Sequence, residues 1–148
     1  MRNTKKILLA LPIAAGLALL GPAVAGAAGE RAASSSRLSG AAEVPGPGDP
    51  DGRGVATVRV DTGDNTVCVR ITVRKIDTAM MAHIHEAPEG VAGPVVVTLD
   101  PPSRAGFSRT CVEVDSDLAS DIAESPEDYY VNVHNEAYPA GAVRGQLR

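Results

Sequence analysis

Apolar and polar residues alternate along short segments of this chain from Leu38 onward. In residues 55–61, Ala56, Val58 and Val60 alternate with polar or charged neighbours, and in 67–73 valine and isoleucine take every second position. A period of two is typical of a β-strand with one buried face. The intervening Thr62–Asn65 has the Gly-Asp-Asn composition of a tight turn. This pattern predicts a β-hairpin and excludes a mainly helical chain.

Six further segments suit strands, at 38–44, 79–86, 95–99, 107–115, 129–134 and 142–147. The Pro- and Gly-rich 45–54 separates the first of them from the hairpin, because no central strand tolerates such a sequence. Residues 116–124 break the alternation and predict one short helix, with Asp115 or Ser116 as its N-cap. About eight strands with short connections favour an antiparallel Greek-key β-sandwich.

The N-terminal 25 residues have the features of a secretory signal peptide. A basic start precedes the apolar run Ile7–Leu20, and Ala23-Val24-Ala25 matches an A-x-A cleavage pattern. The run is short for a membrane span, and no second apolar segment follows. We therefore expect cleavage near Ala25 and a secreted, extracytoplasmic protein. Residues 26–37 are small and polar and predict a flexible tether, which leaves 38–148 as the single domain.

The charge balance argues against two classes of partner. The chain has 14 Lys and Arg against 18 Asp and Glu, and removal of residues 1–25 takes away three basic residues and no acidic one. A net charge of −7 then repels nucleic acid and anionic membranes. The chain has no Trp, one Phe and three Tyr, too few for a platform that stacks bases or sugars. A protein of the extracellular space or cell envelope is the expected partner.

The two cysteines, Cys68 and Cys111, lie on the polar sides of their predicted strands. Two outward-facing cysteines on neighbouring strands can form a bridge without disturbing the core. An exported chain with one cysteine pair and no C-x-x-C spacing favours a structural disulfide over a redox or metal-binding pair.

All three histidines lie at positions of two predicted strands whose side chains point away from the core. His83 and His85 are two residues apart, so they project to one face, with Cα atoms about 6.5–7 Å apart. On the later strand, Tyr130, Asn132 and His134 lie on the face opposite to the inward valines. If the two strands are neighbours, three imidazoles converge, which is a ligand set for copper or zinc.

Three interpretations of these histidines follow from the sequence. In the first they are structural, bonded to backbone carbonyls or to nearby carboxylates such as Glu86, Glu89 or Glu136. In the second they bind a transition metal, with Glu86, Glu136 or water completing the shell. The third is redox catalysis at a bound copper. No G-x-S-x-G elbow or spaced carboxylate pair indicates any other catalytic residue.

Three blocks of the sequence resemble the CHRD domain, named after chordin and also found in secreted bacterial proteins. They are LSGAAEVP (38–45), AHIHEAPEGVAGPVVVTL (82–99) and YVNVHNEAYPAGAVRGQL (130–147). The resemblance extends over about 38–147. It implies an extracellular β domain that mediates interactions, with no established catalytic residue.

The H-I-H strand and the later V-H before a glycine turn are also similar to copper/zinc superoxide dismutase, a Greek-key sandwich. That likeness implies copper ligation by His83, His85 and His134, and an anion-guiding role for Arg144. The chain departs from the pattern, because it has no fourth histidine and no histidine-rich zinc loop. The likeness therefore implies a shared architecture rather than dismutase activity.

Overall fold

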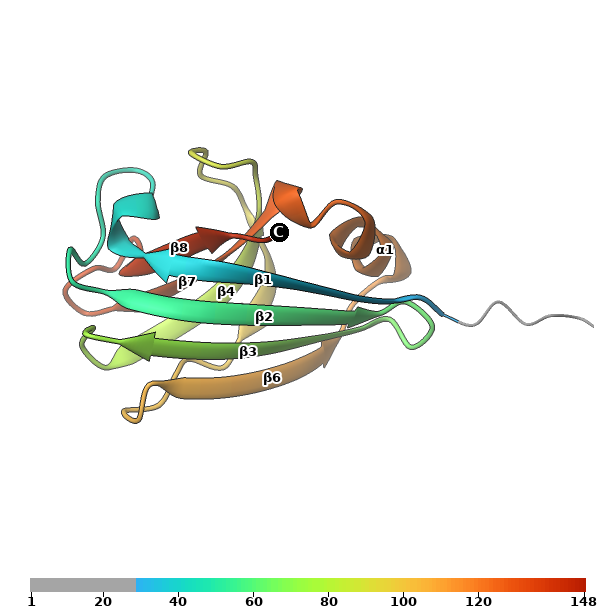
Figure 1. Ribbon diagram of the computed structural model, residues 1–148, viewed down its shortest axis with the longest axis horizontal. Helices are drawn as coiled ribbons and strands as arrows, with labels where there is room; N and C mark the ends of the chain where they lie inside the picture. Colours follow the sequence, from blue (N-terminus) through green and yellow to red (C-terminus); the bar gives the residue numbers. More distant parts are fainter. Residues whose placement is uncertain (1–28) are drawn as a thin grey trace, which may run out of the picture.

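The computed structural model describes residues 29–148, so the predicted signal peptide lies outside the described part. Within this range the chain forms strands, one α-helix and two short 3-10 helices (Figure 1). The elements are β1 (Arg31–Ser39), η1 (Gly40–Ala42), β2 (Arg53–Asp61), β3 (Thr66–Arg74), β4 (Ala79–Glu86), β5 (Val95–Leu99), β6 (Phe107–Glu113), α1 (Ser116–Glu124), η2 (Pro126–Asp128), β7 (Tyr129–Asn135) and β8 (Val143–Gln146).

The strands form one curled antiparallel sheet in the order β5-β4-β7-β8-β1-β2-β3-β6. One half, β1-β2-β3-β6, lies in front of the other in Figure 1. The halves are joined where β1 meets β8, through the pair Ser39 and Arg144. The chain crosses between the halves after β3, β5 and β6, as in a Greek key. The predicted all-β, sandwich-like fold is confirmed.

Alternating side chains of both halves form a single core. The hairpin β2–β3 supplies a row of buried valines, and β4 and β7 supply Ile84, Val131 and Val133. The turn between β2 and β3 lies where the sequence predicts it, and Asn65 there has φ +50°, a conformation that Asn tolerates better than most residues. The hairpin prediction is confirmed.

The first strand differs from the prediction. β1 begins at Arg31, inside the segment predicted to be a tether, and it pairs with β2 along its whole length. Residues 40–42, predicted to be strand, form η1 instead. The inward positions of β1 include Ala32, Ser34 and Ser36, which are small because α1 packs against β1 and β2. A strand built from Ala and Ser has little hydrophobic contrast, so its alternation could not be recognised.

Helix α1 and the disulfide agree with the predictions. The helix spans Ser116–Glu124, and the Asp115 carboxylate caps it by accepting a hydrogen bond from the Leu118 N–H. Cys68 and Cys111 are opposite each other on β3 and β6 and form a disulfide. No helix within residues 29–148 is long and apolar enough to cross a membrane.

Candidate metal centre

The three histidines converge on the outer face of β4 and β7. Ile84 points into the core, so His83 and His85 on either side of it point outward. β7 is the antiparallel neighbour of β4, and its His134 lies opposite Met81. One ring nitrogen from each histidine lies within 4.8 Å of the others. The sequence analysis left open whether the two histidine-bearing strands are neighbours, and the structure shows that they are.

The closest approach is 3.1 Å, between His83 Nδ1 and His134 Nε2. The His83 ring centroid lies 5.0 Å from that of His134 and 5.5 Å from that of His85. Two nitrogens that each lie about 2.0–2.1 Å from one ion are separated by about 3 Å. The spacing of His83 and His134 therefore suits joint ligation of one ion as well as a hydrogen bond between the two rings.

Backbone carbonyls orient two of the rings. His134 Nδ1 donates to Pro139 O at 3.1 Å, and His85 Nδ1 donates to Gly93 O at 2.9 Å. A carbonyl oxygen only accepts, so Nδ1 carries the proton in both neutral rings. Metal-binding histidines commonly donate their other N–H to such a partner. In His134 the Nε2 lone pair then faces His83 Nδ1, so the structural and the metal-binding interpretation concern different nitrogens of that ring. His85 Nε2 lies against Asn132 Oδ1, so it can bind a metal only when the Asn132 amide moves away.

Burial keeps two of the rings neutral. Desolvation lowers the pKa of His83 below its ordinary value, and the neighbouring His134 and His85 lower it further. Desolvation also lowers the pKa of His134, although its bond to the Pro139 carbonyl acts in the opposite direction. Since a metal binds only the deprotonated ring, both groups are in the ligating form at neutral pH.

Asn132 and Tyr130 pack against His85. Asn132 Oδ1 lies 3.1 Å from His85 Nε2. The Tyr130 ring stacks on His85 at 4.7 Å between centroids, 6° from parallel. Its hydroxyl accepts a hydrogen bond from the Gly93 N–H. Together with the bond from His85 to Gly93 O, this holds Gly93 of the β4–β5 connection by two hydrogen bonds.

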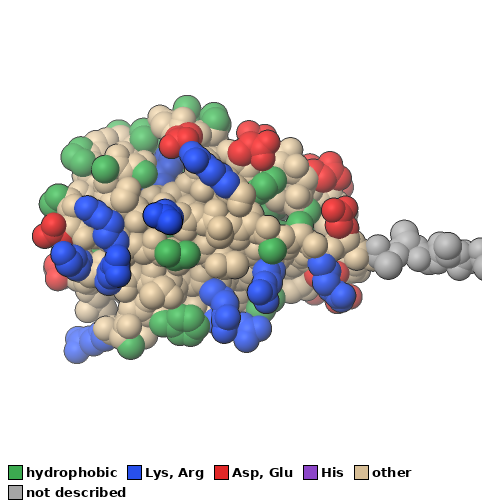
Figure 2. Space-filling view, in the orientation of Figure 1, with side chains coloured by type: hydrophobic (Ala, Val, Ile, Leu, Met, Phe, Trp, Pro, Cys, Tyr) green, Lys and Arg blue, Asp and Glu red, His purple; other side chains and the backbone are tan. Residues whose placement is uncertain are grey.

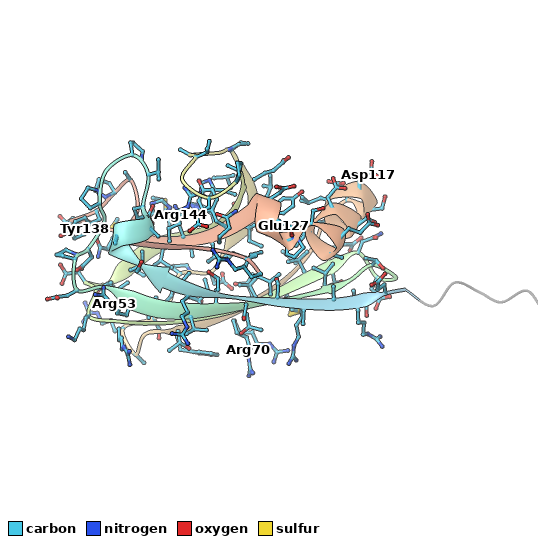
Figure 3. The ribbon with its side chains drawn as sticks, turned by 45° about the horizontal axis from the view of Figure 1, so that its top comes forward. Arg53, Arg70, Asp117, Glu127, Tyr138 and Arg144 are labelled. Carbon is cyan, nitrogen blue, oxygen red and sulfur yellow. A yellow bond between two sulfur atoms is a disulfide. The ribbon has the colours of Figure 1, made fainter. Side chains whose placement is uncertain are left out.

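Arg144 lies beneath this stack rather than at the surface. Its guanidinium carbon is 3.4 Å from the centre of the Tyr130 ring, and its side chain is 2% exposed. Its Nη2 donates to Pro88 O at 3.3 Å. Arg144 thus joins β8 to the β4–β5 connection and supports the ring that stacks on His85 (Figure 3). An arginine that guides anions must be exposed to solvent, whereas Arg144 is buried.

The predicted carboxylates are not part of the cluster. Among the described residues it consists of His83, His85 and His134, while Glu86 and Glu136 are exposed at the ends of their strands. Sequence reasoning missed the carbonyls of Gly93 and Pro139 and the stack of Arg144 on Tyr130. Tyr130 has the same phase along the strand as Asn132, which indicates that it lies on the same face as the histidines. The positions of loop carbonyls, in contrast, cannot be derived from a sequence pattern.

The comparisons with known proteins gave one result. The family model described as CHRD domain matches residues 34–147. The searches of curated proteins and of solved structures gave no match. The matched range includes β2 to β8 and most of β1, and with them all three histidines and both cysteines. The chain therefore belongs to the CHRD domain family.

Proposed function

We propose that this CHRD module is an extracytoplasmic copper-binding protein whose ligands are His83, His85 and His134. The observation that supports it is the convergence of three ring nitrogens within 4.8 Å of one another. Imidazole suits both copper and zinc, and divalent copper binds most tightly in the series of first-row metals. The disulfide Cys68–Cys111 supports an oxidising compartment.

The first prediction concerns His83, which lies between the other two rings. Replacement of His83 with alanine removes one of three ligands, and even the loss of an outer partner of a ligand costs 10–100-fold in affinity. We expect Cu²⁺ to bind the purified protein at a ratio of one, and His83→Ala to weaken it at least tenfold. Isothermal titration and elemental analysis of the dialysed protein measure this.

Thr98→Ala is the matched control for this experiment. Thr98 is the β5 partner of His83 on the same outer face and is exposed. Its variant should bind copper as the wild type does. The proposal fails if the wild type does not bind Cu²⁺ at micromolar concentration, or if His83→Ala binds copper unchanged.

A second prediction concerns Met81, which shares the face of the histidines. It lies opposite His134 and two residues before His83, and it is 44% exposed. Thioethers are soft ligands that favour Cu⁺ over Zn²⁺. We expect Met81→Leu to weaken Cu⁺ binding about tenfold and to leave Zn²⁺ binding unchanged, in competition titrations with a chromogenic chelator.

Met80→Leu is the control for Met81, since Met80 is the adjacent residue, is 60% exposed and lies in the irregularity between Ala79 and Met81, where it has no register partner on β7. X-ray absorption of the copper-loaded protein provides a direct readout. A sulfur neighbour of copper should be present in the wild type and in Met80→Leu and absent in Met81→Leu. Equal Cu⁺ affinity in all three proteins would remove Met81 from the ligand set.

A further inference from the structure

Arginines gather on the outer face of the front half of the sheet, β1-β2-β3-β6. Seven of the ten arginines in residues 29–148 are exposed at outward positions of these strands. We call the surface formed by the six that have no salt bridge the arginine face; it consists of Arg37, Arg53, Arg59, Arg70, Arg74 and Arg109. Two acidic residues, Asp61 and Glu113, lie at one end of it, and Asp61 is paired with Arg31.

The arginine face sets like charges directly opposite one another. Arg70 on β3 is the register partner of Arg109 on β6, and Arg53 on β2 is the partner of Arg74 on β3. Opposed like charges destabilise a sheet. The salt bridges of the described residues, Arg31–Asp61 and Arg148–Glu89, include none of these four residues. The repulsion is therefore uncompensated within this part of the chain.

A shallow depression lies in the middle of this face. It has a volume of about 160 Å³ and is lined by Thr57, Arg59, Cys68, Arg70 and Arg109. Three guanidinium groups and a hydroxyl thus border one concavity, and the disulfide is part of its wall. Guanidinium forks bind sulfate, phosphate or carboxylate groups through two parallel hydrogen bonds.

The excess of acidic residues lies on another side of the molecule. Figure 2 shows carboxylates over α1 at the upper right, while Lys and Arg side chains are spread over the left and lower parts of this view. In Figure 3, Arg70 projects from the side opposite to Asp117 and Glu127. At physiological ionic strength the field of a charge decays over about 8 Å. The negative net charge therefore does not prevent an anion from binding at the arginine face.

We infer that the arginine face binds an acidic polysaccharide. From Arg53 to Arg59 it extends about 20 Å along the strands, so a linear chain with repeated anionic groups spans it better than a single small anion. Its one aromatic side chain is Phe107, at the edge strand. Single-stranded nucleic acid needs several stacking rings, so a polysaccharide fits this surface better.

Dextran sulfate and uncharged dextran are the probes for this inference. We expect dextran sulfate to bind the purified protein in biolayer interferometry, with an affinity that falls steeply as salt rises because counterions are released. The double variant Arg70→Glu/Arg109→Glu should weaken binding at least tenfold. The control, Arg148→Glu, makes the same charge change at one position outside the face and should stay within twofold of the wild type.

Circular dichroism and the disulfide content show whether the double variant is folded, and Arg70→Gln/Arg109→Gln provides a milder form of the same test. Equal binding of uncharged dextran, or equal loss in Arg148→Glu, would overturn the inference. So would tighter binding of an oligonucleotide than of dextran sulfate, or a charge-dependent dimer in sedimentation that occupies the face. Copper binding is independent of this result, because the histidines lie on the other half of the sheet.

Discussion

Replacing both Cys68 and Cys111 with alanine is expected to lower the free energy of unfolding by about 4 kcal/mol. The disulfide connects residues 43 positions apart, and a link of that length removes a large part of the conformational entropy of the unfolded chain. Neither cysteine is buried, so alanine leaves no cavity. Urea denaturation followed by circular dichroism measures the loss.

Strand β6 should show the change first. It is an edge strand that pairs with β3 alone, so without the disulfide only its ladder and its apolar contacts hold it. Hydrogen exchange of the amides of Phe107–Glu113 should accelerate more than that of β7, an interior strand. Reducing agent should destabilise the wild type to the same extent and leave the double variant unaffected. A loss below 1 kcal/mol would show that the disulfide has no stabilising role.

The sequence was most informative where one face of a strand is fully apolar. The hairpin β2–β3 alternates between apolar, mostly valine, and polar residues, and in β4 Ala82 and Ile84 alternate with His83 and His85. Their phase, and with it the outward direction of the two histidines, could therefore be derived. β1 was missed because Ala32, Ser34 and Ser36 give almost no contrast with their neighbours. Its position is set by full-length pairing with β2, a long-range interaction that local patterns do not contain.

The candidate site, too, could be predicted only in part from the sequence. The common phase of His83, His85 and His134 was visible in the sequence, but their convergence depends on β4 and β7 being neighbours. The two carbonyls that orient the rings come from loops, whose conformation depends on the whole domain. Arg144 resembles a surface cation in the sequence. It is buried against the Tyr130 ring, the Pro88 carbonyl and the Gln146 side chain, and its charge acts on the nearby Glu43.

The ionisation of Glu43 makes the surroundings of Arg144 depend on pH. Its side chain is 7% exposed and follows η1. Burial raises its pKa from 4.5 to about 7, although the nearby charge of Arg144 acts in the opposite direction. Gly141 leaves room for the carboxylate, because a Cβ at that position would lie 2.3 Å from Glu43 Cδ. Ionisation of Glu43 therefore changes the surroundings of the arginine that supports Tyr130.

The sign of the resulting pH dependence follows from the two pKa values. Between pH 4.5 and 7 the folded protein retains the proton on Glu43 and the unfolded chain loses it, so this group favours folding less as the pH rises. The whole shift corresponds to about 3 kcal/mol. His83 and His134 act in the other direction, because their lowered pKa values cost stability as the pH falls below about 6.5.

Glu43→Gln is expected to remove the first of these two effects and leave the second. Glutamine is neutral at every pH, so the stability of the variant relative to the wild type should rise by about 3 kcal/mol between pH 4 and pH 8. Urea denaturation of both proteins across that range measures the difference, in which the contributions of the histidines cancel. Glu136→Gln is the control, since it removes an exposed carboxylate from the neighbouring β7–β8 connection. A constant difference for Glu43→Gln, or an equal gain for Glu136→Gln, would show that burial of Glu43 does not govern the pH dependence.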